Sequence, residues 1–177
     1  MWRVFGSEDF LPMTARWIRL GAMSQNEFDA TTRALAALQA RTAAPLLAWS
    51  EEAARYPFAL VVPLKFAPGR RDRWLSWGLA AAVATYRQFG VPAYLDGEIT
   101  LHARRIAHTR VAQLGECAVV ASSFLMRFPE CCVATPSREL EQAFRLRLEA
   151  QHGWSFEFSW PSRPEAQAIG AVSLAAR

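Results

Sequence analysis

Apolar side chains recur at helical spacing in four parts of the chain. The first part follows Ser24, which forms a capping-box pattern with Glu27, because each side chain can accept a hydrogen bond from the other residue's backbone N–H. The second part, rich in Ala, Leu and Trp, ends at Gly90, a residue suited to the left-handed position after a helix. The pattern predicts helices over Asn26–Ala40, Arg70–Phe89, Ser137–Gly153 and, as a short last helix, Ala166–Ala176.

Shorter apolar runs between turn residues predict strands. Two early runs, Pro45–Trp49 and Pro57–Phe66, are rich in Leu and Val and are short enough to be buried strands. After Gly90 the chain changes to short extended segments that fit an antiparallel meander, namely Ala93–Leu95, Glu98–Leu101, Arg105–Val111 and Cys117–Phe128. This order predicts one α/β (α+β) domain over residues 1–177, with a largely antiparallel mixed sheet flanked by helices.

The composition fits a chain that folds around its own core, since 52% of its 177 residues are hydrophobic. The best apolar stretch, Trp74–Tyr86, is shorter than the roughly 20 residues that a membrane span needs. The first residues carry Glu8 and Asp9 and lack the basic start and apolar block of a signal peptide. We therefore expect a cytoplasmic protein with no membrane partner.

The side chains that most often bind metals do not cluster. Cys117, Cys131 and Cys132 lack the close paired spacing of zinc ligands, so we predict free thiols and no metal site. The net charge of +4 comes mostly from clustered arginines, which favours an anionic ligand. Acidic residues are interspersed and no nucleic-acid-binding module is recognisable, so no nucleic-acid partner is expected.

The path from Trp77 to Gly153 carries a family pattern. An Ala-rich helix leads through Gly90 to a strand and a hairpin that contains Arg104-Arg105-Ile106-Ala107, and Ser123 ends a later turn-like triplet. This order resembles the biotin and lipoate protein ligase superfamily, whose hairpin reads like G-R-K-I-A-G and whose later turn reads like H-G-S. The resemblance implies the class II synthetase-like fold of the biotin and lipoate ligases.

The resemblance also implies a site. It puts Arg105 on the family's active-site lysine and Glu98 on its conserved acid, which makes these two the candidate catalytic residues. The implied ligands are a small acyl group and ATP or an acyl-adenylate of the lipoyl or octanoyl type. The implied partner is a lipoyl or biotinyl carrier domain or another protein. The candidate ligand-binding residues are Arg104, Arg105, Ile106, Ala107 and Ser123.

The sequence departs from the family at positions that matter for chemistry. Arginine keeps the positive charge and can bind an anion through two N–H groups, but it is bulkier than the lysine ammonium. Ala103 and His108 replace the hairpin's two glycines, and Pro45–Phe66 holds none of the glycines of the family's nucleotide loop. We therefore expect a degenerate member that binds an acyl or lipoyl-type ligand, or a partner protein, without full ligase activity.

Three alternatives stay open. The chain can be an active lipoate or octanoate ligase or acyltransferase in which Arg105 does the work of the lysine. Octanoyl-transferring relatives use a cysteine nucleophile, for which Cys131 or Cys132 suits better than Cys117. The chain can also be a non-catalytic interaction domain, in which case the arginine clusters serve the solubility of the surface. Glu98 beside Arg104 and Arg105 can equally be a structural ion pair.

Overall fold

The protein is built around a six-stranded sheet. The computed structural model describes residues 13–39, 43–52, 55–125, 127–128, 131–132 and 137–176. The strand order is β11-β1-β2-β3-β8-β7. β1 pairs in parallel with β2 and β11, whereas the other three pairings are antiparallel. The strands are β1 (Met13–Arg19), β2 (Leu46–Trp49), β3 (Arg55–Pro63), β7 (Arg110–Leu114), β8 (Cys117–Leu125) and β11 (Trp154–Phe158).

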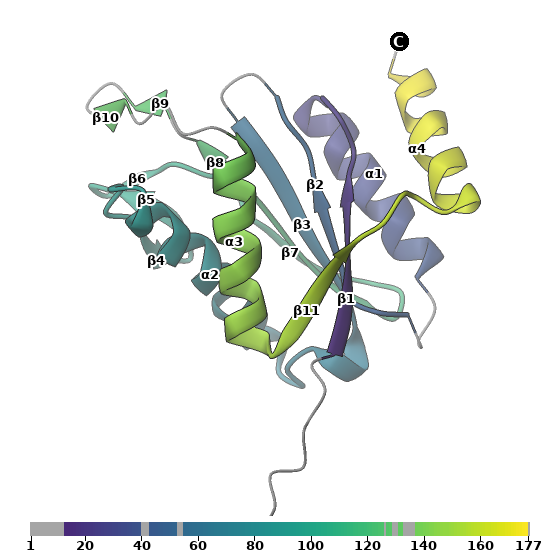
Figure 1. Cartoon of the computed structure of the whole chain (residues 1–177), viewed down its shortest axis with the longest axis horizontal. Coiled ribbons are helices and arrows are strands. Elements are labelled where there is room, and N and C mark those ends of the chain that lie inside the picture. The colour runs from purple at the N-terminus through teal and green to yellow at the C-terminus, as the bar shows by residue number, and fades with distance from the viewer. Residues whose placement is uncertain are drawn as a thin grey trace, which may run out of the picture.

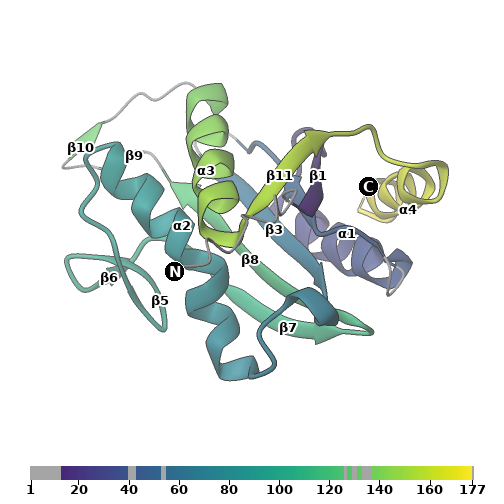
Figure 2. The ribbon, with the colours of Figure 1, turned by 60° about the horizontal axis from the view of Figure 1, so that its bottom comes forward.

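Helices cover both faces of this sheet (Figures 1 and 2). α1 (Gln25–Leu38) and α4 (Arg163–Ala175) pack together on one side, and α2 (Trp74–Gln88) and α3 (Ser137–His152) lie on the other. Two short 3-10 turns, η1 (Leu64–Phe66) and η2 (Arg71–Arg73), connect β3 to α2. The result is a three-layer sandwich with a core on each side of the sheet.

Strand β8 shows how one strand serves both cores. Successive side chains of a strand point to opposite faces of the sheet. Val119 and Ala121 accordingly join the core beneath α1, whereas Val120 joins the core beneath α2. At Gly78 helix α2 comes so close to β8 that an added Cβ would lie 2.7 Å from Cγ1 of Val120. Glycine at this position is therefore what lets α2 sit directly on the sheet.

A second, small sheet extends from the end of α2. It consists of β4 (Tyr94–Asp96), β5 (Glu98–Leu101) and β6 (Arg104–Arg105), paired antiparallel in that order. Ile99 and Leu101 are buried in the core that α2 shares with the main sheet. A short pair, β9 (Arg127–Phe128) and β10 (Cys131–Cys132), follows β8.

The largely antiparallel α/β architecture is confirmed, and each predicted helix is present, although α2 begins at Trp74, after the 3-10 turn η2, and not at Arg70. The Ser24 capping box is present at the start of α1. The last helix begins earlier than predicted, at Arg163, because Ser162 caps it and forms a second capping box with Glu165 in its first turn. No helix in the described part of the chain is long and apolar enough to cross a membrane.

Three strand predictions were wrong in detail. The strand predicted to run to Phe66 ends at Pro63, where the chain turns into η1. The strand predicted over Arg105–Val111 is two strands in different sheets, because residues 106–109 cross from the small sheet to the main one. The strand predicted over Cys117–Phe128 is β8 followed by β9, and position 126 lies outside the described residues. β1 and β11 were not predicted.

Candidate functional site

The β5–β6 hairpin places the candidate catalytic residues. Tyr94, Thr100 and Arg105 are cross-strand partners in the small sheet, so their side chains share one face. Glu98 lies on the same face because it is two residues from Thr100. The intervening Ile99 points the other way, into the core with α2. We call the face with Tyr94, Glu98, Thr100 and Arg105 the outer face of the small sheet.

Arg105 and Glu98 form an ion pair on this outer face. Nη1 of Arg105 donates to Oε1 of Glu98 at 3.1 Å, and the two side chains are 58% and 32% exposed. Within the described part of the chain Nη1 is the one guanidinium nitrogen of Arg105 that is engaged. Nε and Nη2 therefore remain available to an anion, and the exposed pair itself contributes little to stability.

Arg104 does not join that pair. It is the cross-strand partner of Leu101, so it lies on the opposite face of the hairpin from Arg105, and it is exposed. The structure thus places the two adjacent arginines, both candidate ligand-binding residues from the sequence, on opposite faces of the hairpin. A ligand held by Arg105 on the outer face meets Arg104 only by reaching around the end of the hairpin.

Residues 106–109 connect the small sheet to the main sheet. The N–H of Ile106 donates to the carbonyl of Ile99 at 3.0 Å, and Ala107 is buried in the shared core. The Oγ1 atom of Thr109 then lies 3.3 Å from the Oγ atom of Ser122 on β8. Ile106 and Ala107 therefore act as the connection between the sheets, and their apolar side chains are at least partly buried.

Ser123 lies at the point where β8 loses its neighbour. The β7 pairing ends at Ala121, and beyond it the hydroxyl of Tyr86 donates to the carbonyl of Ser123 at 3.2 Å and accepts from the N–H of Leu125 at 2.8 Å. Burial raises the pKa of Tyr86, so its hydroxyl keeps its proton. Among the described residues no hydrogen bond or ion pair joins Ser123 to Arg105.

Two tyrosines that matter here were missed by the sequence reasoning. Tyr86 was read only as an apolar position of a helix, and Tyr94 was not singled out, although its hydroxyl accepts from the N–H of Ala103 at 3.0 Å. A usable signal exists for Tyr86, because a tyrosine among the buried alanines of a helix needs a partner for its hydroxyl. The partner of the Tyr86 hydroxyl is backbone far along the chain, and the sequence does not identify which backbone group that is.

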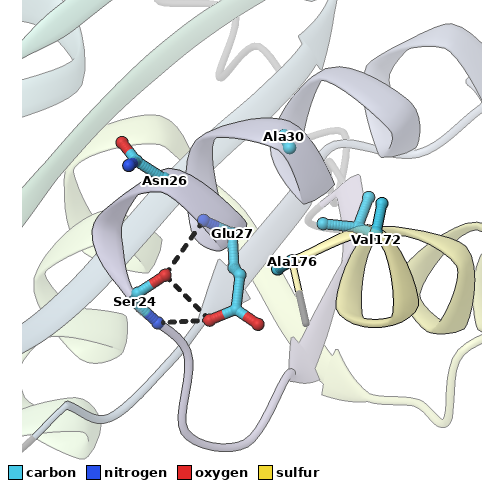
Figure 3. A pocket seen from close by; sticks show the side chains of 7 residues that line it. Ser24, Asn26, Glu27, Ala30, Val172 and Ala176 are labelled. Carbon is cyan, nitrogen blue, oxygen red and sulfur yellow. Dashed lines mark hydrogen bonds between the residues drawn. The ribbon is translucent and has the colours of Figure 1, made fainter.

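Two surface hollows in the described part of the chain lie away from these residues. One of about 410 Å³ opens between the start of α1 and the end of α4 (Figure 3). Another of about 220 Å³ lies between α1 and the β7–β8 pair. Neither is lined by Arg105 or Glu98. The residues around the first are Ser24, Asn26, Glu27, Ala30, Val172, Ala175 and Ala176.

The described part of the connection between β2 and β3, residues 50–52, does not fit a triphosphate. It carries Glu51 and Glu52, and the Oε1 atom of Glu51 accepts from the hydroxyl of Ser137 at 2.6 Å. The backbone N–H groups of Ser50, Glu51 and Glu52 donate to carbonyls of the protein itself, those of Pro57, Gly21 and Arg55. Residues 50–52 therefore offer a phosphate neither free N–H groups nor positive charge, and the next described cation along the chain is Arg55, at the start of β3.

Cysteine and metal chemistry receive no support from the described side chains. Cys117 is free and buried, and burial, with Glu116 nearby, raises the pKa of its thiol, which disfavours the nucleophilic thiolate. The side chains of Cys131 and Cys132 lie outside what the structure describes. No group of three or more His, Cys, Asp or Glu side chains in the described residues is placed to hold a metal ion.

Comparison with known proteins gives a clear answer at the level of the fold. No protein-family model and no curated protein matches the sequence. A solved structure of a lipoate protein ligase from Thermoplasma acidophilum with bound lipoic acid is similar, with a TM-score of 0.75, 10% identity, and coverage of 92% of this chain and 96% of that one.

Two further solved structures are similar to this chain in fold. A bi-partite lipoate protein ligase with its E2 lipoyl domain, also from T. acidophilum, has a TM-score of 0.74 at 10% identity, over 90% of this chain and 92% of that one. A lipoate-protein ligase A bound with ATP has a TM-score of 0.74 at 11% identity, over 90% and 94%. The chain therefore has the fold of the lipoate protein ligases, as the residues from Trp77 to Gly153 led us to expect.

Proposed function

We propose that this protein is a degenerate member of the biotin and lipoate ligase superfamily that binds an acyl or lipoyl-type ligand through Arg105 and lacks full ligase activity. The observation that carries the proposal is the placement of Arg105. It stands at the position that resembles the family's lysine, on the outer face of the small sheet, held by Glu98 through Nη1 alone.

The geometry of Arg105 suits a carboxylate or phosphate. A guanidinium can donate two parallel hydrogen bonds to such an anion, and Nε and Nη2 lie on one edge of the group. Glu98 orients the guanidinium from the Nη1 side, which limits the freedom that binding would otherwise have to remove. The carboxylate of lipoate or octanoate, or the phosphate of an acyl-adenylate, is an anion of this kind.

The loss of full activity rests on the β2–β3 connection. Activation of a carboxylate by ATP requires a site that neutralises the charge of the triphosphate. At this connection Glu51 and Glu52 add negative charge, and the backbone N–H groups of Ser50, Glu51 and Glu52 are already used. Binding of the acyl ligand therefore persists in this proposal, whereas adenylate formation does not.

A carrier domain is the partner we propose. One of the similar structures is a bi-partite ligase together with its E2 lipoyl domain. A protein that holds a lipoyl-type group without activating it has a use if a carrier domain or a second polypeptide brings or receives that group. A pull-down with lipoylated and unlipoylated carrier domains checks this part, and we expect the lipoylated form to be retained more strongly.

The experiment that tests the proposal measures thermal stabilisation by lipoate, octanoate and hydrolysis-resistant acyl-adenylate analogues. We expect at least one of them to raise the melting temperature of the wild-type protein, and Arg105→Ala to abolish the rise. The unliganded melting temperature should hardly change, because the pair with Glu98 is exposed. Arg70→Ala is the matched control, since Arg70 forms a similarly exposed pair with Asp72.

Three results would count against the proposal. A large drop in the unliganded melting temperature of Arg105→Ala would make the pair structural. Stabilisation that survives in Arg105→Ala would move the ligand elsewhere. Transfer of an acyl group to a carrier domain in the presence of ATP, detected by mass spectrometry, would show an active ligase instead of a binding protein.

A further inference from the structure

The turn between β5 and β6 has an unusual backbone for its residues. Leu101 pairs with Arg104, so the loop consists of His102 and Ala103 alone. Both have positive φ, +48° and +61°. Two-residue hairpins of this kind prefer Asn-Gly or Gly-Gly, because a Cβ is disfavoured at positive φ. The turn therefore does not favour its own conformation, and something else must hold it.

The hydroxyl of Tyr94 supplies that hold. It accepts from the N–H of Ala103 at 3.0 Å, and the Oγ1 atom of Thr100 donates to the carbonyl of Tyr94 at 3.2 Å. β6 is only two residues long, and one further backbone bond, from Ile106 to Ile99, follows it. Other described contacts of this hairpin are the ion pair of Arg105 with Glu98 and the buried side chains of Ile99 and Leu101.

The register of the hairpin decides which arginine faces the ligand. A shift of one residue moves every side chain of a strand to the other face. In the observed register Arg105 lies opposite Thr100 on the outer face and reaches Glu98, whereas Arg104 lies opposite Leu101. A slip by one residue would exchange the two arginines and break the ion pair.

We propose that Tyr94 is a positioning residue whose hydroxyl holds the strained His102–Ala103 turn and thereby keeps Arg105, and not Arg104, on the outer face. Its value for ligand binding rests on the function proposed above. The register of the hairpin does not depend on that function, so the proposed role of Tyr94 and the proposed ligand binding can be disproved separately.

The test compares Tyr94→Phe, Ala103→Gly and the double variant. In wild-type protein, NMR should show contact between the Hα atoms of Thr100 and Arg105, and a protected amide at Ala103. Tyr94→Phe should weaken both signals and lower the affinity for lipoate or octanoate about fivefold or more, the usual effect of one lost hydrogen bond. Ala103→Gly alone should change little.

The double variant separates positioning from direct contact. Glycine adopts the turn's positive φ without strain, so Tyr94→Phe/Ala103→Gly should regain the Thr100–Arg105 contact and an affinity within about twofold of wild type. Affinity that stays low although the register returns would make the Tyr94 hydroxyl a direct ligand contact. An unchanged register in Tyr94→Phe would overturn the proposal. Loss of ligand binding in Arg105→Ala together with unchanged register and affinity in Tyr94→Phe would reject this inference alone.

Discussion

The hydroxyl of Tyr86 takes the place of a missing strand beside Ser123. β7 pairs with β8 only as far as Ala121, and the next polar backbone groups on that edge, the carbonyl of Ser123 and the N–H of Leu125, both bind the Tyr86 hydroxyl. Buried backbone groups without partners are costly. Tyr86 therefore satisfies two backbone groups of β8 beyond the point where its pairing with β7 ends.

Tyr86→Phe should destabilise the protein. The change removes one hydroxyl and leaves two buried backbone groups without that partner, so we expect the free energy of unfolding to fall by about 1–3 kcal/mol. Urea denaturation measures it. Tyr56→Phe is the control, because the Tyr56 hydroxyl has no hydrogen-bond partner among the described residues, and its variant should stay within about 0.5 kcal/mol of wild type.

Gly78→Ala should be destabilising in spite of the better helix propensity of alanine. The new Cβ would lie 2.7 Å from Cγ1 of Val120, so α2 or β8 must move, at a cost of about 1–3 kcal/mol. Gly170→Ala is the matched control, since it is also inside a helix but has no atom within 4 Å of the added Cβ. That variant should gain about 0.5–1 kcal/mol. Equal effects of the two changes in thermal denaturation would contradict the close α2–β8 contact.

His152 should make the stability depend on pH in the mildly acidic range. Its ring stacks on Trp154 with 4.4 Å between centroids and lies 4.8 Å from the ring of Trp77, and burial lowers its pKa to about 4. The unfolded chain takes up a proton near pH 6.5, which the folded protein resists. The free energy of unfolding should therefore fall by about 1–2 kcal/mol as the pH is lowered from above 6.5 to 4. This value is smaller than the full pKa shift would give, because the His152 side chain is partly exposed to solvent.

Replacement of this imidazole provides the check. His152→Gln should flatten the stability profile between pH 6.5 and 4 in urea denaturation at several pH values. The same slope in the variant and the wild-type protein would assign the pH dependence to other groups.

The bidentate pair between Arg16 and Glu165 should anchor α4. Both guanidinium–carboxylate contacts are 2.9 Å, and Glu165 is buried. The hydrogen bond from Arg16 lowers the pKa of Glu165, so the pair stabilises the fold above the carboxyl's unfolded value, near 4.5, and its contribution is lost as pH falls through the lower folded value.

Glu165→Gln should cost about 1–3 kcal/mol at pH 7, measured in urea, because the charge of Arg16 loses its partner. The exposed pair of Arg70 and Asp72 offers the comparison, and Asp72→Asn should change stability by less than about 0.5 kcal/mol. If Glu165→Gln unfolds as easily as Asp72→Asn, the pair does not hold the helix.

Part of the candidate site was predictable because its signals are local. Glu98 and Arg105 were found through an ordered pattern around one hairpin, and the structure pairs them. Arg104 was predicted to be a ligand-binding residue as well, and it lies on the other face of the hairpin from Arg105, because adjacent residues of a strand point to opposite faces. Sequence does not show which of the two arginines shares a face with Glu98, since that depends on the register of a hairpin whose turn residues are not glycines.

The sequence by itself determined the elements whose limits are set by neighbouring residues. The Ser24–Glu27 capping box starts α1, and Gly90 follows α2, because both signals act over a few residues of backbone. Only the tertiary structure decided the parallel pairing of β1 with β11, strands far apart in the chain, and the division of residues 105–111 between two sheets. Both depend on hydrogen-bond partners that lie far along the chain, as the Tyr86 hydroxyl does for the carbonyl of Ser123. No pattern within a short window encodes such a partner.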